Sequence, residues 1–352
     1  MKGRSSIARN NSTFQSVNKL RRFFPFIQNF ASWKKRTIVS VLLLFLPFFI
    51  YAQSPAQAIH YFEQENFDKA TPIFENHLKE NPSDAKTREY LGDIASHKKD
   101  WDKAIAHYGI LVKEHPLHAD YRFKYGAAMG MKAVSGSRFR AVSYVWDIKR
   151  ELEMAAQLDP EHIETRWALI EYYLQLPGIF GGSEKKSLEY AVELSKISKV
   201  DGYLAKGHIA EFSNRFKNAE LNYKKAIEVG GSPHTYEKLI KLYEKNQRPI
   251  EAIETASKSL KLHSHNRLNY QIGKICAEYN LKPEYGIQSL SEYLANYSLE
   301  DEVPKEWAFY RLAQLYKNLG QKEIALTWIN KALSGDFNFK DAQEEKSLIL
   351  AL

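Results

Sequence analysis

Small, aromatic and proline residues recur along the chain at a fixed interval of 34 residues. Ala70 is followed 34 positions later by Ala104, and Phe74 by Tyr108. The same interval separates Pro82 from Pro116, and Leu91-Gly92 from Tyr125-Gly126. A repeat of this length indicates stacked two-helix units, and no stretch of useful length alternates apolar and polar residues as a strand would. We therefore predict an all-helical chain.

These spacings resemble the tetratricopeptide repeat. In that 34-residue unit a small residue stands at position 8, Ala at 20, an aromatic residue at 24 and Pro at 32. The small residues lie where two helices cross, and the aromatic side chain fills the space left beside the crossing. Pro cannot continue a helix and biases its predecessor away from helical geometry. Asn81-Pro82, His115-Pro116 and Asp159-Pro160 are therefore expected to follow helix ends.

The resemblance implies an all-α fold, a right-handed α-solenoid of about eight antiparallel helix pairs. We expect the repeats to occupy residues 53–338 and a capping helix to occupy 339–352, where it would cover the last apolar face. The first two units are expected at 51–84 and 85–118, and the third and fourth begin near Ala119 and Ile163. Each later unit is marked by a pair of motif residues: Gly207 with Tyr223, Tyr236 with Ala252, Gly273 with Leu290, and Ala313 with Ala325. In the seventh unit the second helix, around Gly286, looks degenerate.

Two insertions interrupt the third and fourth units, near residues 133–142 and 176–183. The second contains Gly178, Gly181, Gly182 and Ser183, and it resembles a Pro-Gly-x-x-Gly-Gly insertion of some bacterial members of the family. It does not match the phosphate-binding loop G-x-x-x-x-G-K-[ST], and no strand precedes it. We therefore favour a compact connector, with Ser183 as the N-cap of the next helix. Insertions in repeat proteins often form binding sites, so a ligand-binding or enzymatic pocket remains an alternative here.

The N-terminal 52 residues have the composition of an export signal. Residues 37–52 carry no charge and directly follow Lys34-Lys35-Arg36. A membrane-spanning helix needs roughly 20 apolar residues, whereas a basic flank, a short apolar run and a small final residue are typical of a secretory signal. We expect cleavage after Ala52 and a location in the periplasm or at the cell surface, as in exported proteins of Bacteroidetes. An uncleaved inner-membrane anchor and an organellar presequence are the alternatives.

Composition argues against several functions. Residues 1–52 contain nine of the 50 basic residues and none of the 42 acidic ones, so the rest of the chain is nearly neutral. It lacks the basic stripe of a nucleic-acid-binding domain. The single cysteine, Cys276, excludes an intramolecular disulfide, and the scattered histidines form no motif for a metal ligand set. We predict no metal, no cofactor and no catalytic residue.

The resemblance also places a binding groove on the first helix of each unit. The positions that line this groove in the family correspond here to Glu89, Asp93, Phe123, Glu164, Trp167, Glu171, His208, Lys241, Tyr270, Lys274, Tyr310 and Gln314. This set combines aromatic side chains with carboxylates in the N-terminal half and lysines in the C-terminal half. Such a surface suits an extended peptide or a partner helix. The Lys and Asn pattern of relatives that bind chaperone C-termini is absent.

We therefore predict a non-enzymatic scaffold of the bacterial cell envelope that binds a polypeptide in the groove. A membrane-anchored assembly factor, with the same solenoid and residues 37–52 retained, is the closest alternative.

Overall fold

The computed structural model describes residues 55–136, 138–298, 301–335 and 338–352, with side chains described outside 138–140. The predicted export signal and its cleavage point lie outside these ranges. Within them, none of the helices is long and apolar enough to cross a membrane.

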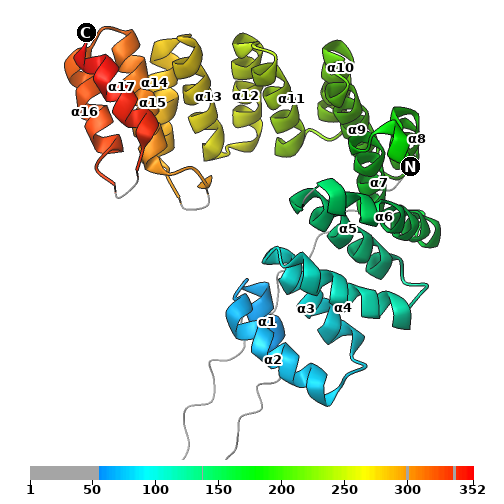
Figure 1. The fold of residues 1–352 in the computed structure, drawn as a ribbon. Coiled ribbons are helices and arrows are strands. Elements are labelled where there is room, and N and C mark those ends of the chain that lie inside the picture. Colours follow the sequence, from blue (N-terminus) through cyan, green and yellow to red (C-terminus); the bar gives the residue numbers. More distant parts are fainter. Residues whose placement is uncertain (1–54, 137, 299–300, 336–337) are drawn as a thin grey trace, which may run out of the picture. The chain divides into compact units, whose positions relative to one another are not determined.

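The described residues form seventeen α-helices, one short 3-10 helix and no strand (Figure 1). The α-helices are α1 Pro55–Glu63, α2 Phe67–Glu80, α3 Ala85–His97, α4 Trp101–Glu114, α5 Ala119–Ser135, α6 Arg138–Leu158, α7 Ile163–Gln175, α8 Glu184–Ile197, α9 Lys199–Phe212, α10 Phe216–Val229, α11 Pro233–Lys245, α12 Pro249–His263, α13 Asn266–Tyr279, α14 Pro283–Ala295, α15 Lys305–Asn318, α16 Lys322–Ala332 and α17 Lys340–Leu350. Each packs chiefly against the helices before and after it in the chain. The result is an α-solenoid of eight helix pairs, α1–α2 to α15–α16, followed by the single helix α17.

Glycine allows the two helices of a pair to approach closely. A Cβ atom on Gly92 would lie 2.5 Å from Cε1 of Tyr108, and one on Gly273 would lie 2.3 Å from Cγ of Leu290. Neither distance is possible for a real side chain without movement, so only glycine fits these backbone positions. The small residue of the first helix and the large residue of the second helix therefore pack directly against each other.

Three arginines donate hydrogen bonds to carbonyl groups at the proline turns between repeats. Arg88 donates to the carbonyl oxygen of Pro82 at 2.5 Å, and Arg122 donates to that of Pro116 at 2.6 Å. Arg166 donates to the carbonyls of Asp159, His162 and Ala156 at 2.7, 3.2 and 3.0 Å. In each case the arginine lies in the first turn of one repeat and binds carbonyls of the turn before it, and the His162 carbonyl belongs to the N-cap of α7 itself. Ala156 lies in the last turn of α6, whose final carbonyls have no intrahelical partner, whereas Pro82 and Pro116 lie in the turns after α2 and α4.

The interrupted third and fourth units keep two helices each. The third has a 17-residue α5 and a 21-residue α6, so its added residues lengthen both helices. In the fourth, Gly178–Phe180 form the 3-10 helix, and Gly181 adopts a positive φ of 92°. The hydroxyl of Ser183 accepts a hydrogen bond from the Lys186 amide and caps α8. The connector is compact, because a Cβ atom on Gly182 would clash with the carbonyl of Leu176.

The seventh unit differs from the sequence expectation. Its second helix, α14, is a regular 13-residue helix, although Gly286 made it look degenerate. Gly286 is buried, and a Cβ atom there would lie 2.6 Å from Cβ of Cys276 and 3.0 Å from Cδ1 of Leu315. Here too the glycine allows close packing, in this case among α13, α14 and α15. Helix α17 then buries Ala342 and Ile349 against the last pair.

Candidate functional site

The first helices of the pairs are linked to one another by polar contacts. We call the surface formed by α3, α5, α7, α9, α11, α13 and α15 the A-helix surface. The ion pairs across it include Lys124–Glu89 at 2.5 Å, Lys124–Asp93 at 3.0 Å, Lys245–Glu211 at 3.2 Å, Lys274–Glu244 at 2.9 Å and Arg311–Glu278 at 2.6 Å, and the imidazole of His208 lies 2.5 Å from the carboxylate of Glu171. Each pair joins two consecutive A-helices. The predicted groove residues therefore include many that hold the solenoid together.

In the N-terminal part, Lys124 of α5 binds two predicted groove carboxylates of α3. Burial opposes the charged form of Glu89, but hydrogen bonds from Lys124 and Lys86 outweigh this effect and hold the pKa of the Glu89 carboxyl below its usual value. Asp93 also accepts a hydrogen bond from the hydroxyl of Tyr108 at 2.6 Å. Glu89 is 7% exposed and Asp93 is half-buried, so both carboxylates are bound in one ion-pair cluster with Lys124.

In the middle of the surface, Trp167 of α7 donates from Nε1 to Asp201 of α9 at 3.1 Å. Its half-buried ring packs against the apolar clusters on either side of it. Phe123 is also half-buried, with its ring 5.0 Å from that of His162. Glu164 is exposed. Of these predicted residues, the two aromatic side chains contribute to the core as well as to the surface.

Near the C-terminal end, Tyr310 is buried against Phe339 and Trp307. Gln314 donates to the Tyr310 hydroxyl at 2.9 Å and to Glu345 at 3.2 Å. Both predicted groove residues thus help to attach α17 to the last pair.

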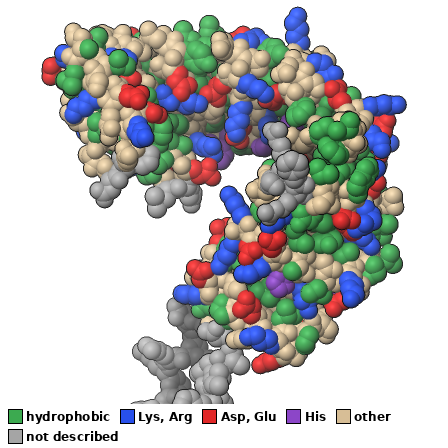
Figure 2. Space-filling view, viewed as in Figure 1, with side chains coloured by type: hydrophobic (Ala, Val, Ile, Leu, Met, Phe, Trp, Pro, Cys, Tyr) green, Lys and Arg blue, Asp and Glu red, His purple; other side chains and the backbone are tan. Residues whose placement is uncertain are grey.

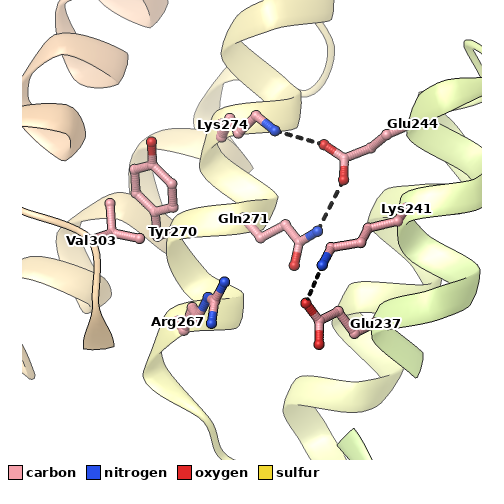
Figure 3. Close-up of a pocket in the computed structure, with 8 residues that line it drawn as sticks. All are labelled: Glu237, Lys241, Glu244, Arg267, Tyr270, Gln271, Lys274 and Val303. Carbon is pink, nitrogen blue, oxygen red and sulfur yellow. Dashed lines mark hydrogen bonds and ion pairs between the residues drawn. The ribbon is translucent and has the colours of Figure 1, made fainter. Parts of the chain in front are cut away.

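A pocket of about 340 Å³ lies between α11 and α13 (Figure 3). It is lined by Glu237, Lys241 and Glu244 of α11, by Arg267, Tyr270, Gln271 and Lys274 of α13, and by Val303. Three of these residues, Lys241, Tyr270 and Lys274, are predicted groove residues. The remaining five were missed, although four of them lie three or four positions from a predicted one, on the same helix face.

Hydrogen bonds fix the polar walls of this pocket. Glu244 accepts from Lys274 at 2.9 Å and from Gln271 at 3.0 Å, and Lys241 pairs with Glu237 at 2.6 Å (Figure 3). Burial lowers the pKa of Lys274, but the bond to Glu244 outweighs it, so the pKa of Lys274 is raised. Burial raises the pKa of the Tyr270 hydroxyl. Lys274 and Tyr270 therefore keep their protons at neutral pH.

The charged residues that follow the insertion loop contact other parts of the protein. Glu184 stands at the start of α8 and pairs with Arg215 at 2.5 Å, and Lys186 lies over the ring of Tyr173. A carboxylate at this helix start disfavours a second anion there. The α11–α13 pocket contains no residue of either insertion.

The remaining features of the sequence are its surface charges and its single cysteine. Basic and acidic side chains are intermixed on the face of the described residues shown in Figure 2. Cys276 is fully buried, and burial raises the pKa of its thiol to about 11. No group of three potential His, Cys, Asp or Glu metal ligands occurs within the described part of the chain.

The comparisons with known proteins agree with this repeat architecture. Family models described as tetratricopeptide repeat match residues 56–116, 200–229 and 308–338. No curated protein matches the chain. These segments are tetratricopeptide repeats, and proteins built of such repeats are generally non-enzymatic scaffolds that bind proteins or peptides.

Several solved structures of repeat proteins are similar. A tetratricopeptide repeat protein from Parabacteroides merdae is 12% identical, with 84% of this chain and 96% of that chain covered and a TM-score of 0.46. YrrB, described as a TPR protein with an unusual peptide-binding site, is 17% identical, with coverage of 57% and 96% and a TM-score of 0.39. A thermophilic TPR protein from Thermus thermophilus is 17% identical, with coverage of 69% and 99% and a TM-score of 0.37.

Proposed function

We propose that the chain is an exported adaptor that binds a partner polypeptide on the A-helix surface. The observation that carries this proposal is the α11–α13 pocket. It combines an aromatic side chain, Tyr270, with the charged groups of Lys241 and Lys274. Aromatic anchors surrounded by polar groups are typical of protein-binding surfaces.

Site-specific photo-cross-linking in the native host tests the binding surface. A photoreactive residue at Lys241, which is exposed, would lie at the pocket, whereas one at Lys261 on α12 would be exposed outside it. We expect cross-linked polypeptides from position 241 and none of the same species from position 261. Identical products at both positions, or none at position 241, would refute the proposal.

The location is a separate part of the proposal, supported by the uncharged run of residues 37–52 after a basic flank. Cell fractionation with N-terminal sequencing tests it. A start at Gln53 in the periplasmic or cell-surface fraction is the expected result. A membrane-bound protein that retains residues 37–52 would instead establish the anchored assembly factor.

A further inference from the structure

The two walls of the α11–α13 pocket carry opposite net charge. The α11 wall has Glu237, Lys241 and Glu244, and the α13 wall has Arg267 and Lys274 beside neutral Tyr270 and Gln271. The α11 wall is therefore formally −1 and the α13 wall is +2. Among the lining residues three cations stand against two carboxylates, which favours an anionic ligand; Glu302, which pairs with Arg267, lies outside the lining.

Both carboxylates of the pocket are already bound. Glu244 accepts hydrogen bonds from Lys274 and Gln271, and Glu237 accepts one from Lys241. A cationic ligand would have to displace these protein donors. A carboxylate ligand, by contrast, can bind the N–H groups of Arg267 that its pair with Glu302 leaves available, because that pair uses only Nη1.

Arg267 is the donor best suited to this task. Its Nη1 atom pairs with Glu302 at 2.6 Å, and both side chains are more than half exposed, at 52% and 68%. Exposed pairs of this kind contribute little stability. A guanidinium group carries five N–H donors in a planar fork that matches a carboxylate. Figure 3 shows Arg267 facing the Lys241–Glu237 pair across the pocket.

An apolar wall lies next to this charged end. Tyr270 has its ring 5.5 Å from that of Tyr293, and the Tyr293 hydroxyl donates to the carbonyl oxygen of Val303. Tyr293 is fully buried, so these contacts hold Tyr270 and Val303 in place. A rigid aromatic side chain can anchor a ligand at a low entropic cost.

We infer that the pocket binds the side chain of an Asp or Glu residue that neighbours an apolar residue in an extended segment of the partner. The carboxylate would bind between Arg267 and Lys241, and the apolar side chain would contact Tyr270 and Val303. This inference rests on the proposed function and specifies its ligand.

The ligand is a side chain rather than a chain terminus because the A-helix surface continues on both sides of the pocket. Lys245 links α11 to Glu211 of α9, and Arg311 links α15 to Glu278 of α13. The A-helices next to α11 and α13 thus extend the surface on both sides of the pocket, and the bound segment would lie along it.

The test uses the chain from Gln53 onward and a random dodecapeptide library displayed with both ends joined to a carrier. Enriched sequences are then made as acetylated and amidated peptides, so that they have no terminal charge. We expect enrichment of Asp or Glu beside an apolar residue. Exchange of that residue for Gln or Asn in the peptide, with the protein unchanged, should weaken binding by about tenfold.

Variants of the protein complete the test. Arg267→Glu and Lys241→Glu should each weaken binding by about tenfold, while Lys261→Glu on α12 should leave it unchanged. Peptides enriched in Lys or Arg, or acidic peptides whose binding is insensitive to both pocket variants, would overturn the inference but not the proposed function. A library that yields no binding peptide, together with no cross-link at position 241, would overturn both.

Discussion

Gly207 of α9 faces the ring of Tyr223 of α10, and a Cβ atom on the glycine would lie 2.4 Å from Cε1 of the tyrosine. Tyr223 is 1% exposed, and its hydroxyl donates to Glu211 at 2.9 Å. The ring is therefore buried and bound at its hydroxyl, which leaves it little room to move aside. This contact repeats the relationship between Gly92 and Tyr108 in the second pair.

We therefore expect Gly207→Ala to lower the free energy of unfolding by about 2 kcal/mol. Overpacking this contact destabilises the fold by more than the higher helix propensity of alanine stabilises it. Gly130→Ala in α5 is the matched control, since nothing lies within 4 Å of its added Cβ atom. The control should gain about 0.5–1 kcal/mol. Urea unfolding followed by circular dichroism measures both, and equal effects would contradict the role assigned to Tyr223.

The free energy of unfolding should change at acid pH as the carboxylate of Glu89 is protonated. Because its pKa is lowered in the folded state, its contribution is complete above its unfolded value of about 4.3 and is lost as the pH falls through the folded value. Glu89→Gln should cost about 2 kcal/mol at pH 7. The difference between variant and wild type should shrink as the pH falls below about 4. Asp68→Asn, which removes an exposed partner of Lys98, should show a smaller effect, and a difference for Glu89→Gln that is unchanged at low pH would contradict the argument.

Arg166 binds three carbonyl groups and is 4% exposed. Arg166→Met keeps much of its apolar volume but leaves those carbonyls without their donors. We expect a loss of about 2–4 kcal/mol in the free energy of unfolding. Arg215→Met, which removes a partly exposed pair with Glu184, should cost less than about 1 kcal/mol. Thermal and urea unfolding would reveal the difference, and a cost for Arg166→Met no larger than the control would show that the turns do not need the guanidinium.

Cys276 should resist thiol reagents in the folded protein. A thiol pKa of about 11 lowers the thiolate fraction at pH 8 by about a hundredfold relative to an ordinary cysteine, and full burial adds to this protection. Labelling with a chromogenic disulfide reagent should be slow in buffer and rapid in denaturant. Rapid labelling under native conditions would show that α13 and α14 separate readily at this point.

The helix pairs could be predicted from local spacing because each repeat position has one dominant steric requirement. Gly92 with Tyr108 and Gly207 with Tyr223 show that the requirement is a pairwise contact within one unit. Gly286 was misinterpreted because its contacts are with Cys276 and Leu315, the latter in a different unit. Spacing within one repeat contains no information about such a neighbour.

The A-helix surface was predictable only in part. Position in the repeat singled out Lys241 and Tyr270, which line the pocket between α11 and α13; whether a partner binds there stays a prediction. It could not show that Glu89 is buried under Lys124, 35 residues later. It also gave no sign that the arginines bind the preceding turns, because those contacts cross the boundary between two units. Pairing between units decides which groove positions stay available to a ligand.

The arginine contacts also determine where this chain can be recombined. A junction placed at a proline turn, the conventional edge of the 34-residue motif, would separate Pro82 from Arg88 or Pro116 from Arg122. In a chimera joined at such an edge, the carbonyl groups of the turn no longer have the arginine that donates hydrogen bonds to them. Crossovers within a helix, between the small residue and the following turn, keep each arginine with its own carbonyl and so define the natural module for grafting or shuffling.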